Sequence, residues 1–540
     1  MLIEQDQYNI GYICSALQCK KSFNGKISLR FIDNHFIRQD YSFKNLDDNS
    51  NKIANILNSL GVKKGERVFT YLSKCPELFF IFLGALKHQA VVGTLFANFG
   101  KEALIDRLED SGARVIFTSK KHFKKIKSVS DSLLNLKHII LIDEDEDISE
   151  KTLSFTKLFK TAGSEYQTEK TSRNTPSVLH YTSGSTGKPK GVLHTHQSVL
   201  MQNMTGVEIL KLNSDEIYWC TADPGWVTGT SYGIISPWSL GVTQIHYDGP
   251  FNPENYFKIL SEEKVTVWYT APTLIRMLMQ REPEIYENYD LSNLKYIFSV
   301  GEPLNPEAIH WVKKVLNKDI YDTWFQTETG AIMIANKPGM KIKPGSMGKP
   351  VKEIEAVILN KENKPVDVNT QGKLCIKKGW DSMFVSYLNN EQTYASKFID
   401  GYYFTHDEAK VDAEGYFWFA GRSDDIINTA GHLISPFEIE SSLLEMPEIA
   451  ESAAIAIPDP VLYEAIVVFV KPSQIDSDSE EIALKARLHL SNKLSTIATP
   501  KDVVIKDNIP KNKSGKIMRR LLRAEYLRLD PGDISTLEDF

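Results

Sequence analysis

The chain has 540 residues, of which 42% are hydrophobic and 24% charged, a composition typical of soluble globular proteins. This composition excludes a disordered or fibrous protein, and at ~150 residues per domain the length allows roughly three or four folding units. Lysine and arginine total 63 against 69 acidic residues, so the formal net charge is −6, which gives no indication of nucleic acid as a partner.

The amino-terminal sequence, Met1-Leu-Ile-Glu-Gln-Asp, has neither the basic segment nor the apolar core of a signal peptide. The most apolar run, residues 78–86, is far shorter than the ~20 residues of a membrane-spanning helix. The cysteines contain no C-x-x-C pair, which argues against a disulfide framework or a zinc site. They are Cys14, Cys19, Cys75, Cys220 and Cys375. We therefore expect a cytoplasmic protein without membrane insertion.

The first 300 residues alternate between helical and strand-like patterns. Apolar residues over 53–60 follow helical spacing, with Gly61 at the position of a helix C-cap. A buried helix is predicted over 77–86, and exposed loops are predicted over 143–147 and 162–175. Strands are predicted at 68–72, 114–118, 138–142, 178–181, 265–269 and 296–300. This alternation predicts an α/β fold with parallel sheets.

The pattern changes near residue 422. Short strands are predicted at 451–457, 465–470 and 502–506, with a helix over 479–494. A compact α+β domain of ~115 residues is therefore expected at the carboxyl terminus.

A glycine-rich segment, Tyr181-Thr-Ser-Gly-Ser-Thr-Gly-Lys-Pro-Lys-Gly-Val192, follows one of the predicted strands. Its glycines allow backbone N–H groups to approach an anion, while its hydroxyl groups add donors and its two lysines add positive charge. The segment differs from a Walker A loop because Lys188 is followed by Pro189. It predicts a cradle for a triphosphate. The expected ATP-binding residues here are Thr182, Ser183, Gly184, Ser185, Thr186, Gly187 and Lys190.

Two histidines, His194 and His196, lie close together in the sequence just after this segment. A pair of histidines can ligate a metal, but the sequence shows no third ligand beside them. We expect ordinary loop contacts for both.

This segment and seven further motifs resemble those of the acyl- and aryl-adenylate-forming enzymes, and within them the acetyl-CoA synthetase-like ligases. The resemblance extends from about residue 46 to about residue 520, and the motifs occur in the family's order. They are Asp223-Pro-Gly-Trp-Val-Thr-Gly229, Ser299-Val-Gly-Glu-Pro303, Tyr321-Asp-Thr-Trp-Phe-Gln-Thr-Glu-Thr-Gly330, Lys343-Pro-Gly-Ser-Met-Gly-Lys-Pro350, Thr405-His-Asp407, Gly415-Tyr-Phe-Trp-Phe-Ala-Gly-Arg-Ser-Asp-Asp425 and Pro510-Lys-Asn-Lys-Ser-Gly-Lys516.

The resemblance implies a large α/β domain of layered sheets with a small barrel-like subdomain, followed by a small, mobile α+β domain. The large domain would span 1–422, the hinge 423–425 with Asp424, and the small domain 426–540. The implied reaction has two halves. A carboxylate attacks the α-phosphate of ATP and releases pyrophosphate, and the thiol of coenzyme A then attacks the acyl-adenylate.

The resemblance also assigns roles to individual residues. Lys516 would be the mobile cation that stabilises the transition state of adenylation. Thr327 would contact the α-phosphate, and Glu328 would hold Mg²⁺, a hard cation suited to one carboxylate plus phosphates. Asp407 and Arg422 would grip the ribose. The residues implied to bind ATP outside the glycine-rich segment are Gly301, Glu302, Pro303, Asp322, Thr323, Trp324, Phe325, Gln326, Thr327, Asp407 and Arg422.

The implied acyl pocket is formed by Val227, Thr228, Val300 and Phe325. Acetate-type members of the family have Trp at the position of Phe325, and members for longer acids tend to have Gly. The smaller Phe ring leaves room for roughly one or two methylenes, each worth ~1–3 kcal/mol of discrimination. Acetate and propionate are therefore the expected acids. A branched, medium-chain or aryl acid is the alternative, and a non-catalytic nucleotide-binding relative is a second one.

Two departures from the family fall in the small domain. Ala430 and Gly431 match the segment implied to bind CoA, but Leu433 replaces an arginine that meets the nucleotide phosphate. Farther on, Leu462-Tyr-Glu464 replaces Arg-Gly-Glu. These departures leave open whether activity is weakened and whether the acceptor thiol belongs to CoA or to a carrier protein. Acetylation of Lys516 would remove its charge, so a lysine acetyltransferase and a deacetylase are implied partners.

Overall fold

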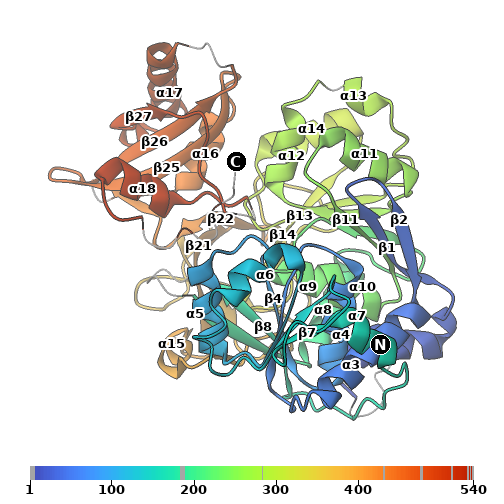
Figure 1. Cartoon of the computed structure of the whole chain (residues 1–540). Helices are drawn as coiled ribbons and strands as arrows, with labels where there is room; N and C mark the ends of the chain where they lie inside the picture. The colour runs from blue at the N-terminus through green and yellow to red at the C-terminus, as the bar shows by residue number, and fades with distance from the viewer. Residues whose placement is uncertain are drawn as a thin grey trace.

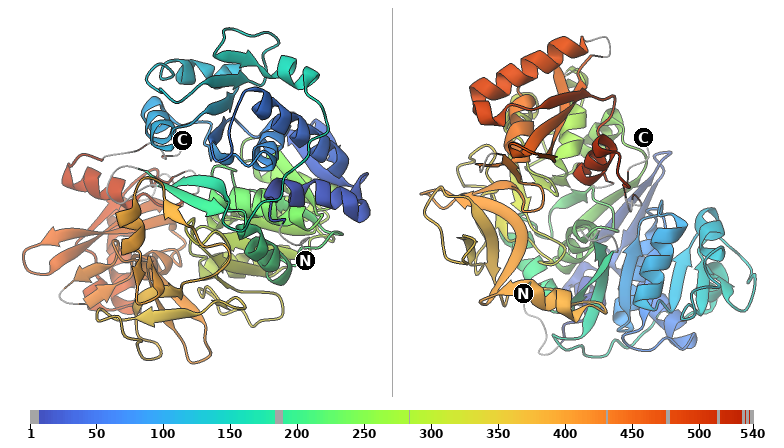
Figure 2. Two further views of the ribbon diagram at one scale, coloured as in Figure 1. Left: turned by 90° about the horizontal axis from the view of Figure 1, so that it is seen from below. Right: turned by 90° about the vertical axis from the view of Figure 1, so that its left-hand side faces the viewer.

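The computed structural model of the chain describes residues 7–182, 189–282, 284–429, 432–474, 478–512, 515–531, 534 and 537, without the side chain of Leu433. A large amino-terminal domain contains most of these residues, and a small carboxyl-terminal domain lies against one side of it (Figure 1). Figure 2 shows the small domain at one end of the molecule in two further views. None of the helices in the described ranges is both long and apolar enough to cross a membrane.

The first sheet of the large domain has eight strands in the order β19-β9-β8-β4-β3-β5-β6-β7. Along this order, the neighbouring strands β4, β3, β5, β6 and β7 pair in parallel. Strands β8 and β9 form an antiparallel pair. The strands predicted at 68–72, 114–118, 138–142 and 178–181 are confirmed here. The bounds are β3 (Arg67–Tyr71), β4 (Val91–Leu95), β5 (Val115–Thr118), β6 (His138–Leu141), β7 (Thr152–Ser154), β8 (Pro176–Thr182), β9 (Lys190–Thr195) and β19 (Ser386–Tyr387). The accompanying helices are α3 (Phe43–Ser59), α4 (Pro76–Lys87), α5 (Lys101–Ser111), α6 (Lys120–Lys127) and α7 (Phe155–Thr161).

Helix α3 begins at Phe43, well before the predicted start at residue 53. Ser42 caps it by accepting a hydrogen bond from the Asn45 N–H, and the Asn45 side chain accepts one from the Ser42 N–H. This reciprocal cap satisfies two backbone donors that the helix leaves open. The polar first half of α3 carries too few apolar residues for the periodicity to detect it, which is why the prediction was too short.

The second sheet has nine strands in the order β16-β15-β14-β13-β12-β10-β11-β1-β2, and the strands from β14 to β1 are parallel. The strands predicted at 265–269 and 296–300 are confirmed as β12 (Val267–Thr270) and β13 (Tyr296–Val300). The other strands are β1 (Ile27–Asp33), β2 (Arg38–Ser42), β10 (Ile217–Cys220), β11 (Thr243–Asp248), β14 (Ile320–Trp324), β15 (Ile334–Ala335) and β16 (Lys349–Pro350).

The remaining helices of the large domain before the third sheet include three whose first residue is proline, where its missing N–H costs nothing. These three are α11 (Pro253–Glu262), α12 (Pro272–Met279) and α14 (Pro306–Leu316). The others are α1 (Ile10–Cys14), α2 (Ala16–Gln18), α8 (Ser198–Glu208), α9 (Val227–Thr230), α10 (Ser236–Ser239) and α13 (Glu284–Glu287), with π-helical turns at Cys19–Phe23 and Ser231–Ile235.

A third, five-stranded antiparallel sheet completes the large domain. It consists of β17 (Ala356–Leu359), β18 (Gly372–Lys377), β20 (Phe398–Ile399), β21 (Tyr402–Val411) and β22 (Phe417–Arg422), with α15 (Glu391–Ser396) beside it. The sequence reading assigned no strands to this stretch.

The small domain has its own five-stranded sheet, in which β27 pairs in parallel with β26 and the other pairs are antiparallel. Two clusters of buried apolar residues are formed entirely by this domain, so it has the core of a separate folding unit. The predicted strands and helix are confirmed, and β25 and β26 are longer than expected. The bounds are β23 (Ile427–Thr429), β24 (His432–Ile434), β25 (Ile449–Asp459), β26 (Tyr463–Pro472), β27 (Asp502–Ile505), α16 (Pro436–Leu443), α17 (Ser479–Lys493), α18 (Arg519–Leu527) and a short 3-10 helix, Thr496–Ala498.

Candidate active site

Two adjacent parallel strands of the second sheet deliver the central site residues. The pairing of β13 with β14 sets Val300 opposite Thr323, so the segments after both strands emerge at the same edge. Gly301, with φ of +95°, turns the chain immediately after β13. Ligand sites in α/β folds form where the carboxyl ends of such strands meet. The motifs at 299–303 and 321–330 are therefore brought together by strand order.

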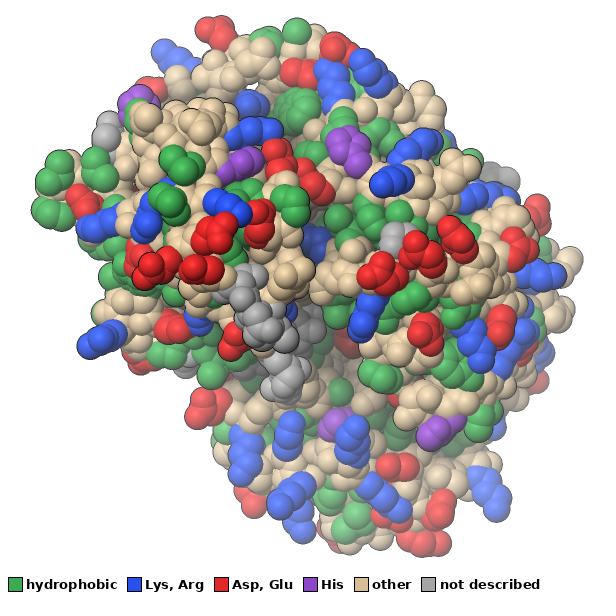
Figure 3. Space-filling model, turned by 90° about the horizontal axis from the view of Figure 1, so that it is seen from above, with side chains coloured by type: hydrophobic (Ala, Val, Ile, Leu, Met, Phe, Trp, Pro, Cys, Tyr) green, Lys and Arg blue, Asp and Glu red, His purple; other side chains and the backbone are tan. Residues whose placement is uncertain are grey.

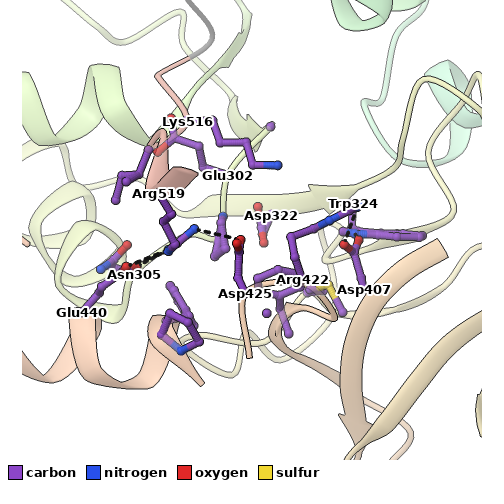
Figure 4. Close-up of a pocket in the computed structure, with 18 of the residues that line it drawn as sticks. Glu302, Asn305, Asp322, Trp324, Asp407, Arg422, Asp425, Glu440, Lys516 and Arg519 are labelled. Atoms are coloured by element: carbon purple, nitrogen blue, oxygen red, sulfur yellow. Dashed lines mark hydrogen bonds and ion pairs between the residues drawn. The ribbon is translucent and has the colours of Figure 1, made fainter. Parts of the chain in front are cut away.

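A cavity of about 220 Å³ lies at this edge, between the large and the small domain. From above, the molecular surface is hollowed between the two domains (Figure 3). Figure 4 shows residues of both domains around the cavity, with Lys516 and Glu302 at one end and Trp324 and Asp407 at the other. The sequence-predicted residues that line it are Gly301, Glu302, Pro303, Asp322, Thr323, Trp324, Phe325, Gln326, Asp407, Arg422 and Lys516.

Asp407 is the centre of a hydrogen-bonded group. The antiparallel pairing of β21 with β22 sets it opposite Arg422, whose Nη1 lies 2.9 Å from Asp407 Oδ1. Asp407 Oδ2 accepts hydrogen bonds from Trp324 Nε1 and Gln326 Nε2, each at 3.0 Å. Burial would lower the pKa of Arg422, but the charge of Asp407 outweighs it and raises the pKa. The group thus presents a fixed carboxylate and a permanent cation to the cavity.

Asp322 lies in the wall of the cavity and is buried. Its Oδ1 has no hydrogen-bond partner within the described part of the chain. Burial raises the pKa of Asp322 well above its ordinary value. A buried polar oxygen without a partner is costly, so this position favours a ligand that donates a hydrogen bond.

Thr327 and Glu328 lie just beyond the cavity wall, in the turn after β14. The Thr327 carbonyl accepts a hydrogen bond from His194 Nε2 at 2.8 Å. Glu328 Oε1 accepts one from the Tyr387 hydroxyl at 2.7 Å. Burial, and then the charge of Glu328, raise the pKa of Tyr387 and keep its hydroxyl protonated. Tyr387 was missed by the sequence reading because only the pairing of β19 with β9 brings it here.

The glycine-rich segment lies mostly outside the described residues, including Ser183, Gly184, Ser185, Thr186 and Gly187. Its flanks are described: Thr182 at the end of β8 stands opposite Lys190 at the start of β9. Lys190 Nζ lies 5.9 Å from the centroid of the Tyr387 ring. The cation therefore lies near the side chain that holds Glu328.

Lys516 extends from a tight turn of the small domain and is exposed to the cavity. Asn512 closes the turn: its backbone N–H donates to the Lys516 carbonyl at 2.8 Å, and its Oδ1 accepts from the Lys516 N–H at 3.0 Å. Desolvation between the two domains, followed by the charge of Arg422, lowers the pKa of the Lys516 ammonium. An anionic ligand in the cavity would favour the charged form of Lys516 and so offset the cost of its desolvation.

The proposed acyl-pocket residues are placed less directly. Phe325 lines the cavity, and its ring packs edge-on against Tyr232, with the ring centroids 5.4 Å apart. Val227, Thr228 and Val300 are buried and are not among the residues at the cavity surface. Their assignment to the acyl pocket remains a prediction.

The residues expected to act in the thiol step and at the hinge are only partly described. Ala430, Gly431 and the side chain of Leu433 lie outside the described parts. Asp424 is exposed in the turn after β22. Tyr463, which replaces a family glycine, has φ of +69°, a left-handed conformation that favours glycine.

The two histidines noted in the sequence form hydrogen bonds within the protein. His194 donates to the Thr327 carbonyl, as described above, and His196 Nδ1 accepts from the Ile10 N–H at 3.0 Å. Burial lowers the pKa of His194 to about 4, so its ring is neutral at pH 7. His194 therefore holds the backbone of the Thr327 turn.

The sequence reading also missed polar residues at the contact between the domains. Thr273 and Arg276 of α12 contact Glu302, and Thr273 also contacts Gly515 of the small domain. Their types and spacing are unremarkable for a surface helix, so no sequence signal indicated them.

Comparison with known proteins agrees with this arrangement. Residues 19–388 match the family model described as AMP-binding enzyme, and residues 438–516 match that described as AMP-binding enzyme C-terminal domain. The chain is 44% identical over 503 residues to acetyl-coenzyme A synthetase of Bacillus subtilis (strain 168), covering 93% of this chain and 88% of that protein. It is 36% identical over 525 residues to acetyl-coenzyme A synthetase of Salmonella typhi, covering 92% and 80%.

Solved structures with the same overall fold include two acid–CoA ligases. An anthranilate CoA ligase, AuaEII, in complex with anthranoyl-AMP aligns with a TM-score of 0.88 at 27% identity, covering 96% of this chain and 97% of that chain. An acyl-CoA synthetase of Brucella canis aligns with a TM-score of 0.75 at 30% identity, covering 96% and 94%.

Proposed function

Because the chain belongs to the AMP-binding enzyme family, we propose that it activates acetate or another short-chain carboxylate with ATP and transfers the acyl group to coenzyme A. It is thus an AMP-forming acid–thiol ligase. The observation that carries the proposal is the convergence of Asp322, the Asp407–Arg422 pair and Lys516 on one cavity between two domains. The similarity to acetyl-coenzyme A synthetases over 93% of the chain supports acetate as the acid.

In the first half-reaction, an oxygen of the carboxylate attacks the α-phosphorus of ATP, and the bond to the bridging oxygen breaks. Pyrophosphate leaves with the electron pair, and the acyl-adenylate forms. Two anions must approach each other, so the site needs cations that face the developing charge. Lys516 supplies one from the small domain, and Thr327 supplies a hydroxyl to the α-phosphate. Asp407 and Arg422 hold the ribose, and Asp322 accepts from the adenine amino group.

Glu328 is the residue that would hold Mg²⁺ beside the phosphates. The donor set fits, since one carboxylate plus substrate phosphates is a usual environment for this cation. Tyr387 fixes Glu328 through the 2.7 Å hydrogen bond, so the carboxylate is oriented before a substrate binds. When bound, Mg²⁺ would offset the charge of the phosphates.

In the second half-reaction, the sulfur of coenzyme A attacks the acyl carbon, and AMP leaves with the electron pair of the broken C–O bond. The proposed division is a large domain over 1–422, a hinge over 423–425 with Asp424, and a small domain over 426–540. Movement about this hinge would withdraw Lys516 and bring Ala430 and Gly431 to the thiol. Five free cysteines suit a reducing compartment, and we place the enzyme in the cytoplasm.

Lys516 is also the proposed point of control by a lysine acetyltransferase and a deacetylase. Acetylation would remove the charge that the first half-reaction requires. Protein fully acetylated at Lys516 should form no acyl-adenylate, and full activity of that protein would contradict this control.

The test is ATP–pyrophosphate exchange with a panel of acids, followed by product analysis with coenzyme A. We expect exchange with acetate and propionate and formation of the matching acyl-CoA. Exchange only with a branched, medium-chain or aryl acid would support the alternative substrate class. Absence of exchange with every acid, with nucleotide binding retained, would identify a non-catalytic relative.

A further inference from the structure

The turn that carries Lys516 reaches the large domain through Gly515. The Gly515 carbonyl lies 3.2 Å from the hydroxyl of Thr273, the second residue of helix α12. Gly515 has φ of +86°, and its N–H donates to the Asn512 carbonyl at 2.7 Å. The turn is therefore internally closed, and its backbone contacts the large domain one residue before the catalytic lysine.

Gly515 fits this position because it has no side chain. A Cβ atom built on it would lie 2.5 Å from Thr273 Oγ1 and 2.6 Å from Glu302 Oε1. Carbon and oxygen atoms do not approach so closely without displacement. The contact thus requires glycine for two independent reasons, its left-handed backbone and the closeness of the opposing side chains.

The opposing surface is a hydrogen-bonded group of three side chains. Thr273 Oγ1 lies 2.6 Å from Glu302 Oε1 and accepts from Arg276 Nη2 at 2.6 Å, while Arg276 Nη2 also pairs with Glu302 Oε2 at 2.5 Å. Glu302 is nearly buried, with 8% of its side chain exposed. The single hydroxyl proton of Thr273 is shared between Glu302 and Gly515. Arg276 thus supplies Glu302 with a counter-charge within the large domain.

We propose that Thr273 and Arg276 are positioning residues of the adenylation half-reaction: with Glu302 they form a seat for Gly515, and the seat holds Lys516 at the cavity. This inference rests on the proposed function, because it assigns the seat to the first half-reaction. Two members of the seat, Arg276 and Glu302, line the cavity, whereas Thr273 is not among the residues at the cavity surface. Loss of the Thr273 hydroxyl reduces the fraction of enzyme in which Lys516 is in place and keeps both cavity-lining members of the seat, Arg276 and Glu302.

The primary test compares Thr273→Val, which keeps the shape but removes the hydroxyl, with Thr273→Ser, which keeps the hydroxyl. Loss of a partly buried hydrogen bond should lower kcat for pyrophosphate exchange about five- to tenfold in Thr273→Val, with Thr273→Ser close to wild type. KM for ATP and for the acid should change by no more than about twofold, because the altered side chain does not line the cavity and the residues that do are retained. Formation of acyl-CoA from supplied acyl-adenylate should be retained, because that step does not use Lys516.

A second pair of variants separates the contact from backbone strain. Gly515→Ala adds a Cβ that meets the seat, whereas Gly401→Ala adds one at a φ of +84° with no atom within 4 Å. Both variants bear a similar left-handed strain. We expect Gly515→Ala to reduce exchange about tenfold or more and Gly401→Ala to leave it near the wild-type rate.

Hydrogen–deuterium exchange of the peptide containing Gly515 measures the docking without catalysis. Exchange should be faster in Thr273→Val than in wild type and Thr273→Ser. Equal exchange in all three proteins, or an unchanged kcat in both Thr273→Val and Gly515→Ala, would overturn the proposal. Failure of the wild-type enzyme to exchange pyrophosphate with any acid would instead overturn the proposed function, while the deuterium measurement would still test whether the seat exists.

Discussion

Lys516 is exposed to the cavity, yet its positive charge is disfavoured by the protein around it. Desolvation and the neighbouring Arg422 both lower the pKa of its ammonium group, while Asp425 and Asp407 act in the opposite direction. The ammonium form of Lys516 is thus less favoured here than in water, and bound phosphates would stabilise it. This is the electrostatic arrangement expected of a group that acts on an anionic transition state.

This lowered pKa predicts an alkaline limit to activity. The protonated fraction of Lys516 falls above its pKa, so kcat/KM for ATP in pyrophosphate exchange should decline at a pH below ~10.4, the ordinary value for lysine. In Lys516→Arg the guanidinium remains charged, so any residual activity should not show this decline. If kcat/KM declined at the same alkaline pH in the wild-type enzyme and in Lys516→Arg, a group other than Lys516 would be responsible for the decline.

Phe325 is the residue on which the acid preference depends in our interpretation. Phe325→Trp should shift preference from propionate toward acetate, and Phe325→Gly should admit acids longer by several carbons. Each methylene gained or lost should change the activation free energy that corresponds to kcat/KM by ~1–3 kcal/mol. The measurement is pyrophosphate exchange across a series of linear acids. An unchanged profile in both variants would exclude Phe325 from the pocket.

Among the elements, helices α16 and α18 of the small domain are joined by a buried ion pair. Arg519 Nη2 lies 2.7 Å from both carboxylate oxygens of Glu440, and Glu440 Oε1 also accepts from the Ala454 N–H at 2.8 Å. Arg519 Nη1 lies 3.5 Å from Asp425, at the end of the proposed hinge. Glu440 therefore links α18, through Arg519, to the small-domain sheet at Ala454, and Arg519 also links α18 to the proposed hinge at Asp425.

Breaking this pair should destabilise the small domain. Glu440→Gln removes the nearer counter-charge of Arg519 and leaves only Asp425 at 3.5 Å, and breaking a buried pair in this way costs up to ~3–5 kcal/mol. The midpoint of denaturant unfolding, followed by circular dichroism on the whole chain, measures the loss. The double variant Glu440→Leu/Arg519→Met should be more stable than either single change, because it removes both charges together. Additive losses would show that the two residues do not act as a pair.

At the scale of the whole molecule, the cavity is completed by both domains. Asp407 and Arg422 come from the large domain, and Lys516 comes from the small one. The described arrangement, with Lys516 at the cavity, is the one that adenylation needs. In the proposed function, the thiol step uses a different face of the small domain, so the two half-reactions should respond differently to loss of the lysine.

Lys516→Ala should abolish pyrophosphate exchange and leave acyl-CoA formation from supplied acyl-adenylate largely intact. The reason is that the proposed function requires the cation for the attack on phosphorus and withdraws it before the thiol step. Both half-reactions should be measured on the same preparation. An equal fall in both would contradict a role confined to adenylation.

The sequence by itself determined the parallel α/β class, the separate carboxyl-terminal domain and the charged residues Asp407, Arg422 and Lys516 at the cavity. Strands such as β3 and β13 were predictable because short buried runs of apolar residues signal them locally. The glycine-rich segment was predictable because glycine, hydroxyl and lysine side chains suit a phosphate, whereas the other site residues were implied by the resemblance of ordered motifs to a known family. The first ten residues of α3 were not, because their polar pattern conceals a helix that its cap and its packing stabilise.

Only the tertiary structure decided which distant side chains meet. Tyr387 reaches Glu328 because β19 pairs with β9, and Thr273 reaches Gly515 because the small domain docks on α12. Neither contact leaves a periodic or compositional signal, since each depends on one hydrogen bond between segments far apart in the chain. Local sequence encodes local conformation and chemistry, whereas these contacts follow from strand order and domain position, which are properties of the whole fold.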